Sequence, residues 1–312
     1  MENIIEIKNL VKNYNDKKAV DGISFDVKKG EVLGFLGPNG AGKSTTINII
    51  STVLKQTAGE IIFEGKNIQE NLKYFKNSIG IVPQDLAIYE DITAIDNLKF
   101  FASLYGISKK EVEANSLEAL RFVGLLDRAN DKPYTFSGGM KRRLNIACAL
   151  SHKPKLIIMD EPTVGIDPQS RNYILDSIKE LKKMEVTVIY TTHYMEEVEE
   201  IADRIIIIDK GKIVSDCNIE NIRNVIKTNK IIKVITDDFN KNIEEEVLMI
   251  NGVKSVVSGN EEIEFEVVDN FNALGDIFKV LLSNGIVIKD IIKREKNLEN
   301  VFLSLTGKSL RD

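Results

Sequence analysis

The sequence predicts an α/β fold with a parallel-sheet core, followed by a small α+β domain. A glycine-rich loop, Gly37–Thr45, follows the apolar run Val32–Leu36. The further apolar runs Leu156–Met159 and Arg204–Ile208 are typical of parallel strands that are covered on both faces. Later in the chain, Glu262–Val267 alternates between apolar and polar residues, which indicates an antiparallel sheet with one face in water.

The glycine-rich loop has the pattern of a phosphate-binding loop, G-x-x-x-x-G-K-[ST]. It consists of Gly37, Pro38, Asn39, Gly40, Ala41, Gly42, Lys43, Ser44 and Thr45. Glycines allow successive backbone N–H groups to turn toward an anion, Lys43 reaches the β- and γ-phosphates, and Ser44 offers its hydroxyl to Mg²⁺. A helix is predicted over Thr45–Leu54, and its positive N-terminal end would face the phosphates. The loop therefore predicts a nucleotide site.

Length and composition predict two domains. The chain has 312 residues, a net charge of −5 and no block of basic residues, which argues against nucleic acid as the main partner. No apolar run approaches the ~18 residues of a membrane helix, and the N-terminus lacks a signal-peptide pattern, so we expect a cytoplasmic protein. Cys148 and Cys217 lack metal-like spacing and are predicted to be buried or free thiols.

The remaining elements of the first domain, 1–217, follow from periodicity. Ile5–Ile7 and Ile23–Val27 predict an antiparallel lead-in, and Glu60–Glu64 and Ser78–Val82 predict further strands. A helical insertion is predicted at about 93–150. In the helix predicted after His193, the apolar residues face inward, and four acidic residues are predicted to form its solvated face. These four are Glu196, Glu197, Glu199 and Glu200.

The second domain, 218–312, is predicted to be a small α/β sandwich. A helix pattern surrounds Ile277, and Ile286–Ile288 reads as a strand. An amphipathic helix closes the chain and ends at Gly307. Its apolar residues are Leu298, Val301, Phe302 and Leu305.

Two carboxylates stand at the end of the strand Leu156–Met159, the edge at which open α/β sheets bind ligands. Asp160 is predicted to hold Mg²⁺ through water. Glu161 is predicted to accept a proton from, or to orient, the water that attacks the γ-phosphate. The alternative is an acidic pair without a role.

The stretch Thr135–Met140 points to a family. Ser137, Gly138 and Gly139 offer an N-cap hydroxyl and bare backbone N–H groups, which suit a second anion contact, although alone they could be a helix cap. Together with the loop and the strand carboxylates, the stretch resembles the Leu-Ser-Gly-Gly-Gln signature of ATP-binding-cassette (ABC) ATPases. The chain departs from that form at Phe136 and Met140.

The resemblance covers roughly residues 1 to 216 and implies further roles. Tyr14 fits the aromatic residue that stacks on adenine, with an ordinary strand-end tyrosine as the alternative. Gln84 matches the glutamine that contacts Mg²⁺ and the attacking water, and Asp167 lies in the loop that crosses the dimer interface. His193 matches the histidine that contacts the γ-phosphate, whereas His152 matches no motif and is predicted to be structural. The resemblance also implies that Ser137–Gly139 of one subunit closes over Lys43 of the other.

The ending Asn297–Gly307 resembles that of the daunorubicin- and bacitracin-resistance branch of ABC exporters. That branch implies an ATPase that uses ATP and Mg²⁺ on the inner face of the cell membrane. Its partners would be separately encoded membrane subunits and a second ATPase subunit, either a copy or a paralogue. Drugs, antibiotics or lipid-like molecules are the implied cargo, and they would contact the membrane subunits.

Two alternatives remain at this point. A non-transport ABC ATPase acting on ribosomes or DNA usually carries two cassettes or a long coiled-coil insertion, and this chain has neither pattern. A regulatory GTPase would ordinarily need an Asn-Lys-x-Asp motif, and Asn229–Ile232 lacks the acid.

Overall fold

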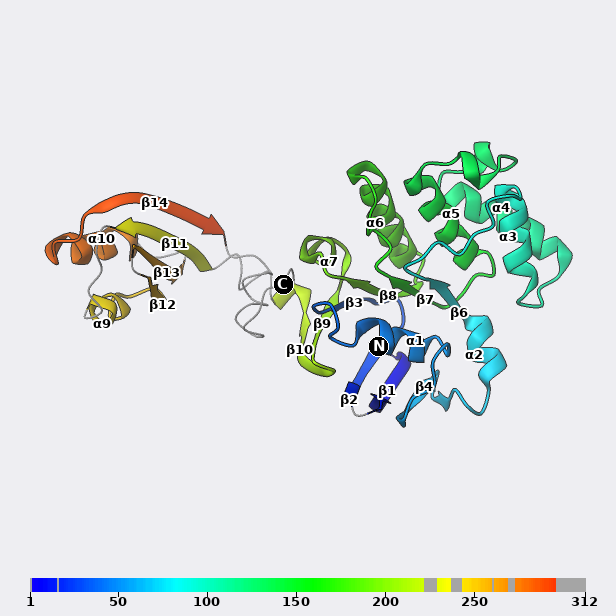
Figure 1. Cartoon of the computed structure of the whole chain (residues 1–312), viewed down its shortest axis with the longest axis horizontal. Helices are drawn as coiled ribbons and strands as arrows, with labels where there is room; N and C mark the ends of the chain where they lie inside the picture. Colours follow the sequence, from blue (N-terminus) through cyan, green and yellow to red (C-terminus); the bar gives the residue numbers. More distant parts are fainter. Residues whose placement is uncertain are drawn as a thin grey trace. The chain divides into compact units, whose positions relative to one another are not determined.

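The computed structural model describes residues 2–15, 17–221, 229–236, 243–259, 261–268 and 273–295. The chain divides into two compact units, one with the residues up to Cys217 and one that begins at Asn218. Each unit is described by itself (Figure 1). The helix and the motif predicted between Asn297 and Gly307 lie outside the described residues.

A six-stranded sheet with the order β10-β9-β3-β8-β7-β6 forms the centre of the first unit. Its strands are β3 (Val32–Leu36), β6 (Ile79–Val82), β7 (Leu156–Asp160), β8 (Thr187–Thr192), β9 (Arg204–Asp209) and β10 (Lys212–Asn218). β3 pairs in parallel with β8 and β9, and β7 pairs in parallel with β6 and β8. The carboxyl ends of β3, β6, β7 and β8 therefore meet at one edge, where such sheets bind ligands.

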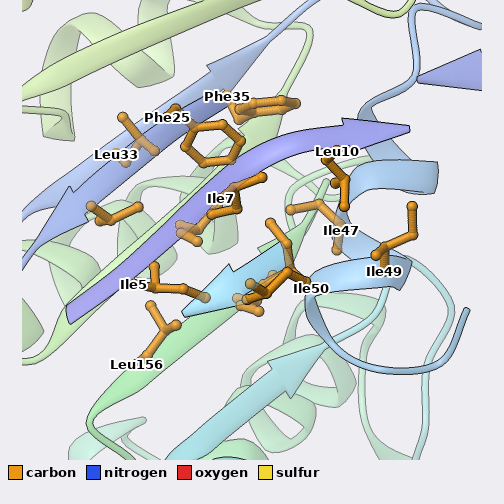
Figure 2. Close-up of a cluster of buried hydrophobic side chains, with 14 of the residues drawn as sticks. Ile5, Ile7, Leu10, Phe25, Leu33, Phe35, Ile47, Ile49, Ile50 and Leu156 are labelled. Atoms are coloured by element: carbon orange, nitrogen blue, oxygen red, sulfur yellow. The ribbon is translucent and has the colours of Figure 1, made fainter. Parts of the chain in front are cut away.

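The central strands are buried on both faces, as their continuous apolar sequences predict. Along β7, Leu156 and Ile158 pack on one side of the sheet, and Ile157 and Met159 pack on the other. The first side is covered by α1 (Lys43–Ile50) and by a second sheet with the order β2-β1-β4-β5. Figure 2 shows this apolar core, in which side chains from both sheets and from α1 come together.

The second sheet contains the predicted antiparallel lead-in. Its strands are β1 (Asn3–Tyr14), β2 (Lys17–Lys28), β4 (Ala58–Phe63) and β5 (Lys66–Asn67). β1 pairs antiparallel with both β2 and β4.

Helices cover the opposite side of the central sheet. They are α3 (Ala94–Ser103), α4 (Lys109–Phe122), α5 (Gly138–Leu150), α6 (Pro168–Lys183) and α7 (Met195–Ile201), while the short α2 (Leu72–Ser78) precedes β6. The two 3-10 turns η1 (Leu126–Arg128) and η2 (Pro133–Thr135) lie between α4 and α5. Side-chain N-caps from Thr93, Ser108, Ser137 and Asp167 fix where four of these helices begin.

Some predicted boundaries were wrong. The helix after the phosphate loop is α1, Lys43–Ile50 rather than Thr45–Leu54, because Thr52 adopts a left-handed φ of 61° that ends the helical path. Ser78 is the last residue of α2 and not the first residue of a strand.

The second unit has a four-stranded antiparallel sheet with the order β12-β13-β11-β14. Its described elements are β11 (Asn229–Thr236), α9 (Ile243–Leu248), β12 (Val253–Ser258), β13 (Glu262–Val268), α10 (Ala273–Ser283) and β14 (Ile288–Glu295). The inward residues of β13, such as Phe265, pack against Val247 of α9 and Ile277 of α10. The strand predicted at Ile286–Ile288 begins only at Ile288, and Ile286 is a core residue before it.

Candidate functional site

The phosphate loop runs from the end of β3 into α1. Its backbone passes so close to the neighbouring β9 that a Cβ on Gly37 would lie 2.3 Å from the carbonyl oxygen of Ile208. Gly42 has a φ of 110°, which side chains of L-residues rarely adopt, and a Cβ there would meet the carbonyl oxygen of Ala19 at 2.5 Å. These two positions therefore require glycine, and they place the first turn of α1 directly behind the loop.

Lys43 closes the loop in this structure. Its Nζ donates hydrogen bonds to the carbonyl oxygens of Gly37 at 2.7 Å and Pro38 at 3.3 Å. The residue is 5% exposed, and burial lowers the pKa of its ammonium group, although the nearby Glu161 opposes that shift. A buried cation that lies beside carbonyl oxygens and carboxylates at the sheet edge is suited to receive an anion.

The two carboxylates at the end of β7 are both buried, with Asp160 8% and Glu161 7% exposed. The Thr191 hydroxyl donates to Oδ1 of Asp160 at 2.6 Å. The backbone N–H of Glu161 donates to the Thr191 carbonyl at 3.1 Å and to its hydroxyl oxygen at 3.0 Å. Thr191 thus fixes both acids. Sequence reasoning missed it, although its place opposite Asp160 in the parallel register follows once β7 and β8 are paired.

Glu161 lies between Lys43 and His193. Its Oε1 is 3.5 Å from Nζ of Lys43, and its Oε2 is 3.4 Å from Nδ1 of His193. Both distances are longer than a usual hydrogen bond, and Nδ1 of His193 is a buried atom without a hydrogen-bond partner among the described residues. Glu161 also has a left-handed φ of 45°, which is rare for a residue other than glycine and is found at functional sites. The structure therefore brings together Lys43, Asp160, Glu161 and His193.

The other predicted residues of the loop and of the sheet edge differ in exposure, and the carbonyl oxygen of Pro38 contacts Lys43 of that cluster. Ser44 is exposed and Thr45 half-buried in the first turn of α1. Gln84 is exposed and follows β6 by two residues. Val82, the last residue of β6, is in register with Met159 of the neighbouring β7, so Gln84 lies one strand away from Asp160. The three loop residues Pro38, Asn39 and Gly40 are partly or fully open to solvent, whereas Ala41 is buried.

Tyr14 ends β1 and is 48% exposed. The Nζ of Lys12 lies 5.3 Å from the centre of its ring. No described contact joins Tyr14 to the phosphate loop.

Ser137 is the N-cap of α5, and its hydroxyl oxygen accepts a hydrogen bond from the N–H of Met140 at 3.2 Å. A Cβ on Gly139 would lie 1.9 Å from the hydroxyl oxygen of Ser170, so the start of α5 packs directly against the start of α6. Asp167 caps α6 and accepts from the N–H of Ser170 at 2.9 Å, a bond that lowers the pKa of its carboxyl group. Gly139 and Asp167 are therefore neighbours, but no described contact brings them to Lys43.

Arg142 is a second residue that sequence reasoning missed. It is 6% exposed and donates to the carbonyl oxygens of Pro83 at 2.9 Å and Gln84 at 2.6 Å. Asn145, one turn later, accepts from the N–H of Ala87 at 3.3 Å. The loop that contains Gln84 is thus held by α5, the helix that begins at Ser137.

The prediction that Glu197 is solvated was wrong. Its exposed fraction is 0%, whereas Glu196 and Glu200 are exposed. Two buried hydroxyls and Arg171 lie around the Glu197 carboxylate and compensate its negative charge. Without such partners, a charged side chain is not expected on the buried side of a helix.

His152 is structural, as predicted. Its ring stacks on Tyr105 with centroids 3.5 Å apart, and its Nε2 bonds to the carbonyl oxygen of Ile79 at 2.9 Å. Burial lowers the pKa of this imidazole to about 4. Cys148 is buried and Cys217 half-buried, and both are free thiols.

Comparisons with known proteins identify the family of this chain. The ABC transporter family model matches residues 20–164. The linearmycin resistance ATP-binding protein LnrL of Bacillus subtilis (strain 168) is 42% identical over 311 residues, which cover 99% of this chain and 100% of that protein. A daunorubicin resistance ATP-binding protein, DrrA3 of Streptomyces coeruleorubidus, is 33% identical over 98% of this chain and 97% of its own length.

A solved structure shares the fold of the first unit. It is a dimeric post-hydrolysis state of an ATP-binding cassette bound to ADP and Pi, with a TM-score of 0.62 and 29% identity over 69% of this chain and 98% of that one. These similarities favour a transporter ATPase over a ribosome- or DNA-acting ATPase or a GTPase. With its phosphate loop and strand carboxylates inside the matched region, the chain belongs to the ABC transporter family as an ATP-binding, ATP-hydrolysing subunit.

Proposed function

We propose that this chain is the ATPase subunit of an exporter and that two ATPase chains, identical or paralogous, pair head to tail around ATP. One observation carries the head-to-tail pairing. Lys43, Glu161 and His193 form one half of a phosphate site, while Ser137 and Gly138 lie exposed elsewhere on the same unit. A Cβ on Gly138 would meet no atom within 4 Å, so its backbone is open to a ligand from another chain. Each half-site then needs a second chain.

Within the site, the loop backbone and Lys43 would hold the phosphates. Mg²⁺, when bound, would neutralise phosphate charge and fix its geometry. Ser44, Gln84 and Asp160 supply the oxygen atoms that this ion prefers, and the bond from Thr191 leaves Oδ2 of Asp160 for a Mg²⁺-bound water. The described residues contain no group of three or more His, Cys, Asp or Glu side chains arranged as a metal cage. That agrees with an ion held largely by phosphates and water.

Glu161 would act as the base. Water attacks the γ-phosphorus, the bond to the ADP oxygen breaks, and the water proton passes to the Glu161 carboxylate. The contact between Lys43 and Glu161 at 3.5 Å would break when Lys43 binds phosphate. The Glu161 carboxylate would then be free to accept the proton. His193, on the other side of Glu161, would contact the γ-phosphate. Tyr14 would contact the adenine, and Asp167 would lie at the dimer interface.

The separately encoded partners would be membrane subunits, with the ATPase bound at the inner face of the membrane. Among the described residues, no helix is long and apolar enough to cross a membrane. Exposed apolar side chains follow Gln84 and continue onto α3, namely Leu86 (40% exposed), Tyr89 (51%) and Phe100 (41%). The rings of Tyr89 and Phe100 are 5.2 Å apart in an edge-on contact. Such a patch is typical of a protein interface.

The relatives are named for resistance to linearmycin and daunorubicin, which supports export of antibiotic or lipid-like molecules as the proposed task. The first unit, 1–217, would be the nucleotide-binding domain, with the helices between 93 and 150 as its helical subdomain. The unit from 218 to 312 would be an accessory domain.

The composite site is tested by mixing two inactive variants. Lys43→Ala damages the loop half and Ser137→Arg damages the signature half, so each homodimer should be inactive. Random pairing gives half mixed dimers with one intact site of two, and recovery should reach at most about a quarter of the wild-type rate.

A matched control mixes Lys43→Ala with Glu161→Gln. Both changes lie in the loop half, so every mixed dimer has two damaged sites and no activity should return. Recovery in this control, or normal activity of Ser137→Arg alone, contradicts the head-to-tail site. Thermal melting of each variant verifies that it is folded.

A further inference from the structure

The turn that carries His193 is built around a fully buried carboxylate. Oε2 of Glu197, on α7, accepts hydrogen bonds from the hydroxyls of Tyr190 at 2.8 Å and Thr192 at 2.8 Å. Nε of Arg171 lies 2.8 Å from Oε1 of Glu197. An ionised carboxylate without exposed surface is stable only while such partners remain, so the positions of these residues are coupled.

The hydroxyls connect this carboxylate to the turn at His193. The Thr192 oxygen that donates to Glu197 also accepts a hydrogen bond from the N–H of Tyr194 at 3.0 Å. The two residues that flank His193 are therefore tied to each other and to Glu197. Arg171 also lies over the ring of Tyr194, with its guanidinium carbon 5.4 Å from the ring centre.

The other two connections reach toward Glu161 and Asp167. The Tyr190 hydroxyl lies 3.3 Å from Oγ1 of Thr163, which follows Glu161 in the loop after β7. Arg171 lies in the first turns of α6, and its backbone N–H donates a helical hydrogen bond to the backbone carbonyl oxygen of Asp167 at 2.9 Å. The ion pair between the buried Glu197 and the half-buried Arg171 thus joins three segments, namely the loop after Glu161, the start of α6 and the turn at His193.

We propose that Glu197 is a positioning residue that keeps His193 and the start of α6 aligned with Glu161 during ATP hydrolysis. This inference rests on the roles proposed above for His193 and Asp167. His193 would contact the nucleotide bound to its own chain, and Asp167 would face the partner subunit. The Glu197–Arg171 pair would therefore align a residue that serves the chain's own nucleotide with a residue that meets the partner. Misplacement of such groups by about 1 Å lowers turnover by up to about 10²-fold.

Glu197→Gln tests the proposal because it keeps the volume and an acceptor for both hydroxyls but places a neutral amide against Arg171. We expect kcat for ATP to fall by about 10-fold to 10²-fold, while KM and the affinity for ATP change by less than about twofold. Steady-state hydrolysis and nucleotide titration of the full chain measure these quantities.

Glu200→Gln is the matched control. Glu200 also joins α7 to α6, through an ion pair with Lys179 at 2.6 Å, but its side chain is 44% exposed. Exposed ion pairs contribute little, so kcat should stay at the wild-type value. An equal fall in kcat for Glu197→Gln and Glu200→Gln would show that any contact between the two helices has the same effect, and the proposal would be wrong.

A second pair of variants separates positioning from simple destabilisation. Arg171→Met in the Glu197→Gln background removes the cation that faces the neutral amide, so kcat should rise above that of Glu197→Gln alone, whereas two independent destabilising changes would lower it further. Tyr190→Phe keeps the ion pair and the core volume and serves if Glu197→Gln does not fold. We expect it to lower kcat by a smaller factor at unchanged KM.

His193→Ala distinguishes failure of this inference from failure of the proposed function. Wild-type hydrolysis by His193→Ala would overturn the role of His193 and the inference with it. Slow hydrolysis by His193→Ala, together with wild-type kcat for both Glu197→Gln and Tyr190→Phe, would overturn the inference alone.

Discussion

Glu161 and Glu197 are both buried carboxylates of the first unit, with 7% and 0% of their surface exposed, but their surroundings differ. Glu197 accepts two hydroxyl hydrogen bonds and pairs with Arg171 at 2.8 Å. Glu161 faces two nitrogen atoms at the longer distances of 3.4 and 3.5 Å, on a backbone with a left-handed φ. A carboxylate with several close partners holds structure in place, whereas one with longer contacts can exchange a proton.

The largest effect should come from Lys43→Ala, because this lysine is the cation that the loop offers to the phosphates. Charge-assisted bonds to two phosphates predict a loss of ATP affinity of about 10²-fold or more. Lys29→Ala removes an exposed lysine paired with Glu2 and should leave the affinity unchanged. Titration with Mg-ATP measures both. Wild-type affinity in Lys43→Ala would mean that this edge of the sheet is not a phosphate site.

Glu161→Gln should come next. The amide cannot accept the water proton, so hydrolysis should slow by about 10²–10⁴-fold while ATP still binds. ATP should then accumulate a closed dimer, which gel filtration with and without ATP detects. The contrast with Glu197 would disappear if Glu161→Gln were no slower than Glu197→Gln, since both carboxylates would then act by position alone.

The smallest effect concerns the two histidines. His193 lies at the phosphate edge, while His152 is stacked, buried and has its pKa lowered to about 4. The unfolded chain therefore gains a proton below about pH 6.5 that the folded chain does not, so stability is full near neutral pH and falls as the pH drops toward about 4. Between about pH 7 and about pH 5 the expected loss of unfolding free energy is about 2 kcal/mol.

In His152→Gln this part of the pH dependence should be absent. Urea unfolding at both pH values, followed with a probe in the first unit, measures the difference between wild type and variant. The same acid-induced loss in both proteins would show that His152 is not responsible.

The fold could be predicted because its signals are local. β3, β7 and β9 are continuous apolar runs that suit strands covered on both faces, and β13 alternates as a strand with one wet face does. The end of α1 was not predictable in the same way. Thr52 has a left-handed φ, although a β-branched residue rarely adopts that conformation.

The centre of the site could also be predicted, since the carboxyl ends of parallel strands necessarily bring Lys43, Asp160 and His193 to one edge. The residues that fix this centre could not. Arg142 and Gln84 are 58 positions apart, and Arg171 and Glu197 are joined only after α6 and α7 pack together. Spacing in the sequence carries no signal for such contacts.

The two neighbouring glycines of the Ser-Gly-Gly stretch meet different demands, although they look equivalent in the sequence. A methyl group at 138 would project into empty space, whereas one at 139 would collide with Ser170. Alanine substitution at each of these two positions would therefore test two different properties of the molecule. A defect at 138 would report on a bound ligand or a second chain, and a defect at 139 would report on the internal fit of two helices.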